Sequence, residues 1–192
     1  MISKLSNRIT QNLFKRHIIL EEDQELYTYG LFMIISHMTF FIIAVLFGII
    51  LNITLWSILF FVSFCLVRNY AGGIHANSEF KCSIITTLSI LFSEVIIKVF
   101  IDYELKWWAF AMLIISSICL IAIKPVATSQ KEISIQEKTR FHKNVIILTV
   151  LILVISVICM ILDIYGVTIC LSIGLTLASI LLILGRLQLG KK

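Results

Sequence analysis

The sequence predicts an all-α, polytopic membrane protein with six transmembrane helices and, before them, an amphipathic helix at the membrane interface. Three observations predict it. The 192 residues are 59% hydrophobic and only 14% charged, whereas soluble domains are about 45–50% apolar and about 25% charged. The apolar residues fall into long runs separated by short polar stretches. One proline and eight glycines leave little room for linkers, which favours a single domain over residues 1–192.

The amphipathic helix is expected within residues 1–28. Apolar side chains recur there every three or four positions, at Ile2, Leu5, Ile9 and Leu13. Basic and polar side chains fill the opposite face, which is typical of a helix lying among lipid headgroups. A plain helix in water is the alternative.

Six apolar runs are candidates to cross a bilayer whose hydrocarbon core is about 30 Å thick. Their expected bounds are 31–51, 53–67, 83–101, 107–123 and 145–162, and the sixth run follows a turn marked by Asp163 and Gly166 and extends to about residue 184. The second run is short for a span, which indicates that the stretch after it dips below the headgroups. Between the fourth and fifth runs we expect a basic loop over residues 124–143.

The distribution of positive charge predicts the orientation. With six spans, fourteen of the sixteen Lys and Arg residues lie on the side of the termini, the 68–82 stretch and the 124–143 loop. The positive-inside rule then makes that side cytoplasmic, in a multi-pass protein of the cell membrane. Because the basic residues are scattered between apolar runs, they indicate topology and not a nucleic-acid partner.

One pair of ionisable residues falls inside the third run. Glu94 and Lys98 are four residues apart, so they share a helical face and can neutralise each other. A structural ion pair is one interpretation, and a functional role in a polar cavity is the other.

The stretch from Arg68 to Cys82 is the polar segment that offers chemistry. A nucleophilic cysteine needs a base, a nearby cation or a helix N-terminus. His75 can act as the base for Cys82, and Arg68 and Lys81 bring positive charge. In one straight helix, His75 and Cys82 would lie about 10.5 Å apart along the axis. A helix is therefore expected to begin after His75, at an N-cap provided by Asn77 or Ser78.

The residues that would complete this site are not fixed by the sequence. Bending at Gly72-Gly73 would fold the imidazole back over the sulfur. Backbone N–H groups of the two glycines, or Arg68, are candidate oxyanion donors. The candidates for orienting His75 are Asn69, Asn77, Ser78 and Glu79. From the residues alone, three interpretations stay open: a catalytic His–Cys dyad, a polar loop with an incidental His and Cys, or a metal site.

The other cysteines argue against a disulfide framework or a zinc site. The number of cysteines is odd, no CxxC spacing occurs, and four of the five lie in apolar runs, where cysteine behaves as a small hydrophobe. No cofactor and no metal is expected.

In the 68–82 stretch the sequence resembles the AgrB family, membrane cysteine peptidases of Gram-positive quorum-sensing systems. The resemblance rests on Arg68, on Gly73 and on the run His75-Ala76-Asn77-Ser78-Glu79-Phe80-Lys81-Cys82. It extends over the chain in length, in the six apolar runs and in the basic loop that begins Lys124-Pro125. One departure is Lys131-Glu132-Ile133, where the family often has Lys-Pro-Ile.

This resemblance implies a cysteine endopeptidase with His75 and Cys82 as catalytic residues, supported by Arg68, Gly73, Ser78 and Glu79. The implied substrate is a small amphipathic pro-peptide with a central signal sequence and an acidic tail. Cys82 would remove the tail and hold the remainder as a thioester, which an internal thiol or hydroxyl captures as a thiolactone or lactone. Candidates for attracting the acidic tail are Lys124, Lys131 and Lys138. By the same resemblance a homodimer is expected.

Two other classes of function are alternatives to the cysteine endopeptidase interpretation. A non-catalytic transporter or chaperone for a small peptide would use the Glu94–Lys98 pair and leave Cys82 dispensable. A thiol-dependent redox protein is disfavoured because the motif has no resolving cysteine.

Overall fold

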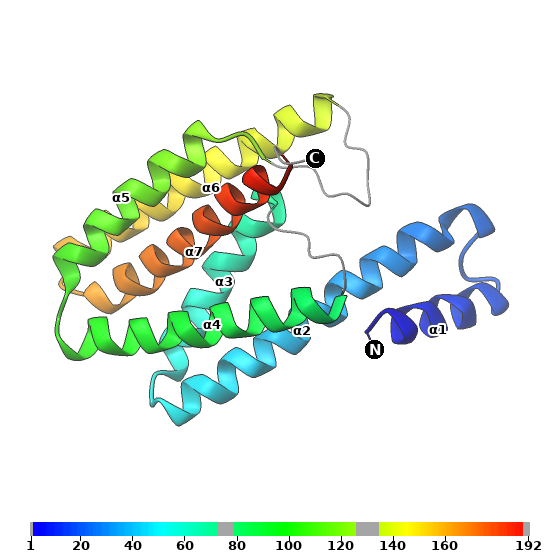
Figure 1. The fold of residues 1–192 in the computed structure, drawn as a ribbon, viewed down its shortest axis with the longest axis horizontal. Helices are drawn as coiled ribbons and strands as arrows, with labels where there is room; N and C mark the ends of the chain where they lie inside the picture. The colour runs from blue at the N-terminus through cyan, green and yellow to red at the C-terminus, as the bar shows by residue number, and fades with distance from the viewer. Residues whose placement is uncertain (1, 73–78, 126–134, 190–192) are drawn as a thin grey trace. The chain divides into compact units, whose positions relative to one another are not determined.

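A computed structural model describes residues 2–72, 79–125 and 135–189, and in these residues the protein is entirely helical (Figure 1). The elements in chain order are α1 (Ile2–Lys15), the short 3-10 helix η1 (Glu21–Asp23), α2 (Gln24–Ile50), α3 (Thr54–Ala71), α4 (Glu79–Asp102), α5 (Lys106–Ala122), α6 (Ile135–Ile161) and α7 (Tyr165–Leu189). Among the described residues, α2, α3, α4, α6 and α7 are long and apolar enough to cross a membrane, and α5 is a shorter apolar helix of 17 residues. The protein is therefore a polytopic membrane protein, as predicted.

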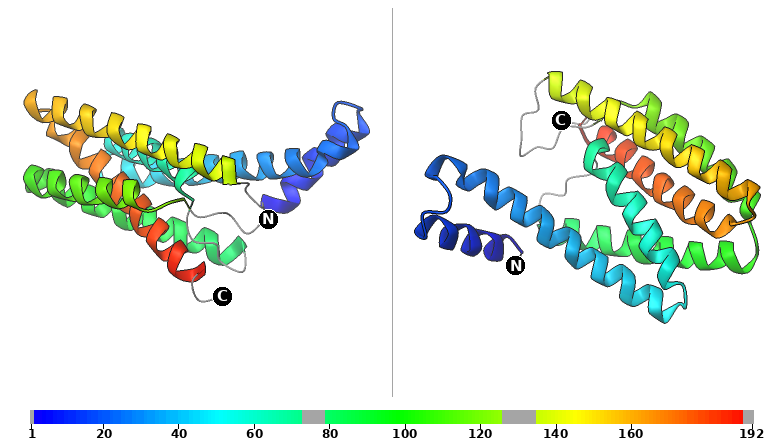
Figure 2. Two further views of the ribbon diagram at one scale, coloured as in Figure 1. Left: turned by 90° about the horizontal axis from the view of Figure 1, so that it is seen from above. Right: turned by 180° about the vertical axis from the view of Figure 1, so that it is seen from behind.

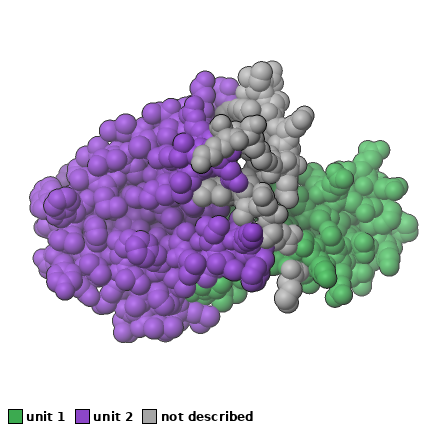
Figure 3. Space-filling view, viewed as in Figure 1, with its two compact units in different colours: residues 1–43 green, residues 44–192 purple. Residues whose placement is uncertain are grey.

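The chain divides into two compact units, Met1–Ile43 and Ala44–Lys192, so that α2 belongs partly to each (Figure 3). The first unit contains α1, η1 and most of α2. The predicted amphipathic helix is confirmed as α1, whose apolar Leu5 is about half exposed while Ser6 and Thr10 are buried. Its position at a membrane interface, and the single domain over the whole chain, stay predictions.

Helix α7 is the central helix of the second unit. It packs against α3, α4, α5 and α6, and Figures 1 and 2 show it running between α3 on one side and α5 and α6 on the other. All residues of α7 from Thr168 to Leu175 are buried. Helix α6 differs, because its apolar side chains Ile147, Leu151 and Val154 are each about half exposed. Large apolar side chains of α7, among them Ile169, Leu175 and Leu182, are buried, so the core of this unit is built around this helix.

Small residues allow the closest of these helix contacts. A side chain added at Gly174 of α7 would lie 3.2 Å from the backbone oxygen of Phe60 and 3.3 Å from the backbone nitrogen of Phe64, both on α3. It would also collide with the Ser63 hydroxyl. Because lipid provides no hydrophobic drive between helices, such close backbone approach is a main source of their attraction.

Substituting Gly174→Ala is expected to lower the free energy of unfolding by about 1–3 kcal/mol, the usual cost of overpacking. The reason is that α3 and α7 must separate to admit the methyl group. Thermal unfolding in detergent micelles, followed by circular dichroism, measures the effect. The matched control is Gly30→Ala in α2, since nothing lies within 4 Å of its added carbon and alanine is the better helix former. Equal melting temperatures for the two variants would contradict the expectation.

Three helix-to-helix turns in the second unit share one geometry. Asn52, Glu104 and Asp163 each follow a helix with positive φ, at 57°, 50° and 56°. In each turn the next residue's N–H bonds back five positions, for example from Ile53 to Gly48 at 2.8 Å. This is the Schellman arrangement, which satisfies the last carbonyls of a helix and reverses the chain at once. The three turns join α2 to α3, α4 to α5 and α6 to α7 without a longer loop. Of these three pairs, α6 and α7 pack together most extensively.

The helix bounds correct two expectations from the sequence. Helix α3 continues to Ala71, so Arg68 to Ala71 form its last turn and the second span is 18 residues long; the short span over 53–67 was wrong. Helix α6 begins at Ile135, so the last nine residues of the expected 124–143 loop are helical. In both cases the helix includes polar residues that lie beyond the end of the apolar run.

The expected pairing of Glu94 with Lys98 is also wrong. Lys98 Nζ instead lies 2.8 Å from Oδ1 of Asp102, one turn further along α4, and both side chains are partly exposed. A lysine side chain near a helix end extends its charge toward the water, where Asp102 is available. Glu94, one turn earlier on α4, is fully buried.

Candidate active site

The candidate site lies where α3 ends and α4 begins. Arg68 is in the last turn of α3, and Cys82 is the fourth residue of α4. Helix α4 begins at Glu79, after His75, as the spacing argument predicted. The predictions for Gly73, His75 and Ser78 concern residues 73–78, which lie outside the described residues.

Gly72 ends α3, and the rest of the predicted Gly72-Gly73 bend lies outside the described residues. The Gly72 N–H bonds to the Arg68 carbonyl oxygen at 3.0 Å, and its dihedral angles are φ 76° and ψ −159°. This region of backbone space is essentially restricted to glycine, because a Cβ atom clashes there. Gly72 therefore fixes the point where the chain leaves α3 for the motif that follows.

Arg68 is held at this helix end by an aromatic ring. Its Cζ atom lies 5.4 Å from the centre of the Phe64 ring, one turn earlier on α3, a cation–π distance. From this position the guanidinium interacts electrostatically with Cys82 on α4 and with Cys65 on its own helix. The fold thus brings together two of the residues that the sequence singled out, fourteen positions apart.

Cys82 is a free, half-buried thiol in the first turn of α4. The first turn of a helix presents unpaired N–H groups and the positive end of the helix dipole. The sulfur therefore has two sources of positive potential, the helix end and the Arg68 guanidinium. Cys65 also interacts electrostatically with the Arg68 guanidinium, but it lies in the interior of α3 and not at a helix N-terminus.

Comparison with known proteins decides the family. A family model described as accessory gene regulator B matches residues 6–182, nearly the whole chain. The chain belongs to the AgrB family. Two relatives are a putative AgrB-like protein 2 from Clostridium perfringens strain 13 and a putative AgrB-like protein from Clostridium perfringens strain SM101. Each is 24% identical over 157 residues, covering 75% of this chain and 70% of the relative. No solved structure matches the chain.

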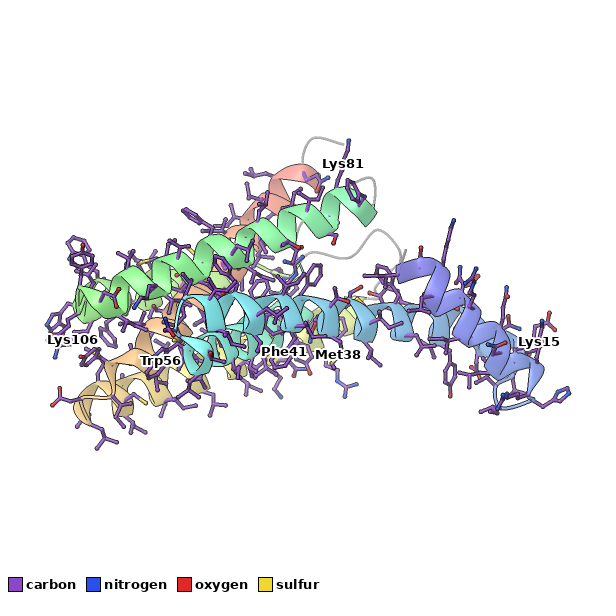
Figure 4. The ribbon with its side chains drawn as sticks, turned by 90° about the horizontal axis from the view of Figure 1, so that it is seen from below. Lys15, Met38, Phe41, Trp56, Lys81 and Lys106 are labelled. Atoms are coloured by element: carbon purple, nitrogen blue, oxygen red, sulfur yellow. The ribbon has the colours of Figure 1, made fainter. Side chains whose placement is uncertain are left out.

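Membership in the AgrB family implies processing of an autoinducing peptide, and the AgrB family is a peptidase family. The matched region contains the whole motif from Arg68 to Cys82. Of the supporting residues, Glu79 begins α4, but its side chain is outside the described part. Figure 4 places Lys81 at the first turn of α4 and Lys106 near the opposite end of that helix.

The lysines proposed to attract an AgrB substrate tail are not gathered at one described surface. Lys124 is exposed, two residues beyond the end of α5. Lys131 lies outside the described residues, and Lys138 is in α6 with its side chain undescribed. A contact that the sequence did not predict joins α3 to α6 near the site: the Tyr70 and Phe141 rings lie 6.1 Å apart and tilted by 60°. No periodicity in either helix signals that pairing.

Proposed function

We propose that this chain is a membrane cysteine endopeptidase that removes the C-terminal tail of a pro-peptide and allows the remainder to cyclise. The observation that carries the proposal is the electrostatic interaction of Arg68 with Cys82, which lies in the first turn of α4, within a family-matched region that also contains His75. A sulfur nucleophile, a cation and a helix end are the parts that acyl transfer through a thioester requires.

The reaction begins when the Cys82 sulfur attacks the carbonyl carbon between the signal sequence and the tail. His75 accepts the thiol proton and then gives it to the departing amine, so the C–N bond breaks as the C–S bond remains. Arg68 stabilises the negative charge on the tetrahedral oxygen, and Ser78 and Glu79 orient the imidazole. An internal thiol or hydroxyl of the bound peptide then attacks the thioester, and Cys82 regains its proton.

The surrounding structure supports the same assignment. A thioester persists long enough to cyclise only where water is held back, and the first turn of a membrane-spanning helix provides such a setting. We place six spans in the bilayer, counting α5, whose 17 residues meet the lower limit of about 17 for a crossing. Both termini and the site are then cytoplasmic, Lys124, Lys131 and Lys138 attract an acidic tail, and the protein acts as a homodimer.

Direct capture of the intermediate tests the proposal. The full chain is co-expressed with a tagged, tripartite pro-peptide whose internal thiols and hydroxyls have been replaced, so that the acyl group cannot be transferred to the peptide. We expect a hydroxylamine-sensitive adduct on the tryptic peptide that contains Cys82. An adduct on another cysteine, or tail release without any adduct in this chain, would exclude the thioester route and favour a transporter or chaperone.

A further inference from the structure

A second polar site lies inside the membrane-spanning core, away from the Cys82 motif. Glu94 is on α4, twelve residues beyond Cys82, and its relative exposure is 0%. Across from it on α3, the hydroxyl of Ser57 is also fully buried and faces the carboxyl group. Neither group makes a hydrogen bond with another described residue. Two facing polar groups without partners mark a site that the proposed peptidase reaction does not use.

No positive charge balances Glu94 from the described helices around it. The segment from Ala44 to Val67, which includes the end of α2 and most of α3, contains no Lys, Arg or His. The first cation on α3 is Arg68, eleven residues beyond Ser57, or about 16 Å along the axis. Helix α7 carries none from Tyr165 to Gly185. On α4 itself, Lys98 forms an ion pair with Asp102, with 2.8 Å between Lys98 Nζ and Asp102 Oδ1.

An ionised carboxylate is poorly matched to these surroundings. It presents two oxygens with about four acceptor sites, and the group that faces them from the described part of α3 is one hydroxyl, that of Ser57. A charge left unpaired in the core of a membrane protein is costly, and such groups neutralise instead. A neutral carboxylic acid needs fewer hydrogen-bond donors around it. Its O–H group donates a hydrogen bond to the Ser57 oxygen, and its carbonyl oxygen remains as an acceptor.

We propose that Glu94 and Ser57 form a proton-binding site between α4 and α3, in which Glu94 is a neutral carboxylic acid that donates a hydrogen bond to Ser57. The ligand of this site is a proton. Gly48 at the end of α2 lies against Ser57, since a Cβ there would meet the Ser57 Cβ at 2.7 Å. Its missing side chain leaves the space that the hydroxyl occupies. The site is independent of the reaction proposed at Cys82.

Infrared difference spectroscopy of the full chain in lipid vesicles at neutral pH tests this site. The wild-type spectrum minus that of Glu94→Gln is expected to contain the carbonyl stretch of a protonated carboxylic acid, which moves to lower frequency in heavy water. Paired carboxylate stretches in its place would overturn the proposal. Asp102→Asn is the matched control: this acid is exposed and bonded to Lys98, so its difference spectrum must contain the carboxylate pair.

Ser57→Ala keeps the test decisive if Glu94→Gln fails to fold. Alanine is smaller than serine, so the tight contact with Gly48 is preserved. Loss of the hydroxyl should shift the carboxylic acid band of Glu94 to higher frequency, because its hydrogen bond is lost. A shift confined to carboxylate bands, or no change in either region, would refute the bond between Glu94 and Ser57.

Discussion

Replacing Cys82 by alanine is expected to abolish release of the pro-peptide tail, whereas replacing Cys65 leaves release close to that of the wild type. Both thiols are half-buried and interact with the Arg68 guanidinium. Only Cys82 is also in the first turn of a helix within the family motif. In the proposed reaction its sulfur forms the bond to the acyl group, so no residual route through the thioester remains.

The measurement is tail release from a tagged pro-peptide co-expressed with each variant, compared at equal amounts of membrane-inserted protein. Cys65→Ala serves as the matched control, since it removes a thiol beside the same cation. His75→Ala should be as inactive as Cys82→Ala, because without a base the thiol keeps its proton. Cleavage by Cys82→Ala, or its loss in Cys65→Ala alone, would move the nucleophile away from α4.

Arg68→Gln is expected to lower the rate of tail release by about 10²–10³-fold, the usual effect of removing one group that stabilises an oxyanion, or about 2.7–4 kcal/mol. The effect should fall on kcat and much less on KM, because the negative charge on the tetrahedral oxygen develops only in the transition state. Single-turnover cleavage of a synthetic pro-peptide by protein in vesicles measures the two constants separately.

Arg68→Lys separates the charge of this residue from its packing. Lysine keeps a positive charge but loses the planar group that lies over Phe64, so partial activity is expected. Phe64→Leu is the complementary control, since it removes the ring and keeps the guanidinium. If Arg68→Gln raises KM alone, the guanidinium binds the substrate and does not stabilise the transition state.

The course of the helices could be predicted from the sequence because it depends on local patterns. Apolar runs of the right length and the glycine at position 72 both act within a few positions of the chain. The start of α4 after His75 followed from a length argument alone. The two bounds that were wrong, at Ala71 and Ile135, lie where a helix continues past its apolar run, which hydropathy does not register.

Contacts between helices could not be predicted in this way. Lys98 has an acid four positions away on either side, and the sequence does not say which one it bonds; burial of Glu94 decides it. The close approach of α7 to α3 at Gly174 depends on how each helix is rotated. At the candidate site, the motif identified the residues, and the fold added an electrostatic interaction between Arg68 on α3 and Cys82 on α4.

The central place of α7 has a consequence for biosynthesis. Helices α3 to α6 precede α7 in the chain, yet each of them packs on it. They therefore leave the ribosome and enter the bilayer before the surface that joins them exists. Until α7 is inserted, hydroxyl groups that are buried in the complete fold face lipid or one another. Insertion machinery or a membrane protease then encounters helices that lack their contacts with α7. Helices α3 and α4 carry Arg68 and Cys82, and the contacts of these two helices with α7 form only after α7 has entered the bilayer.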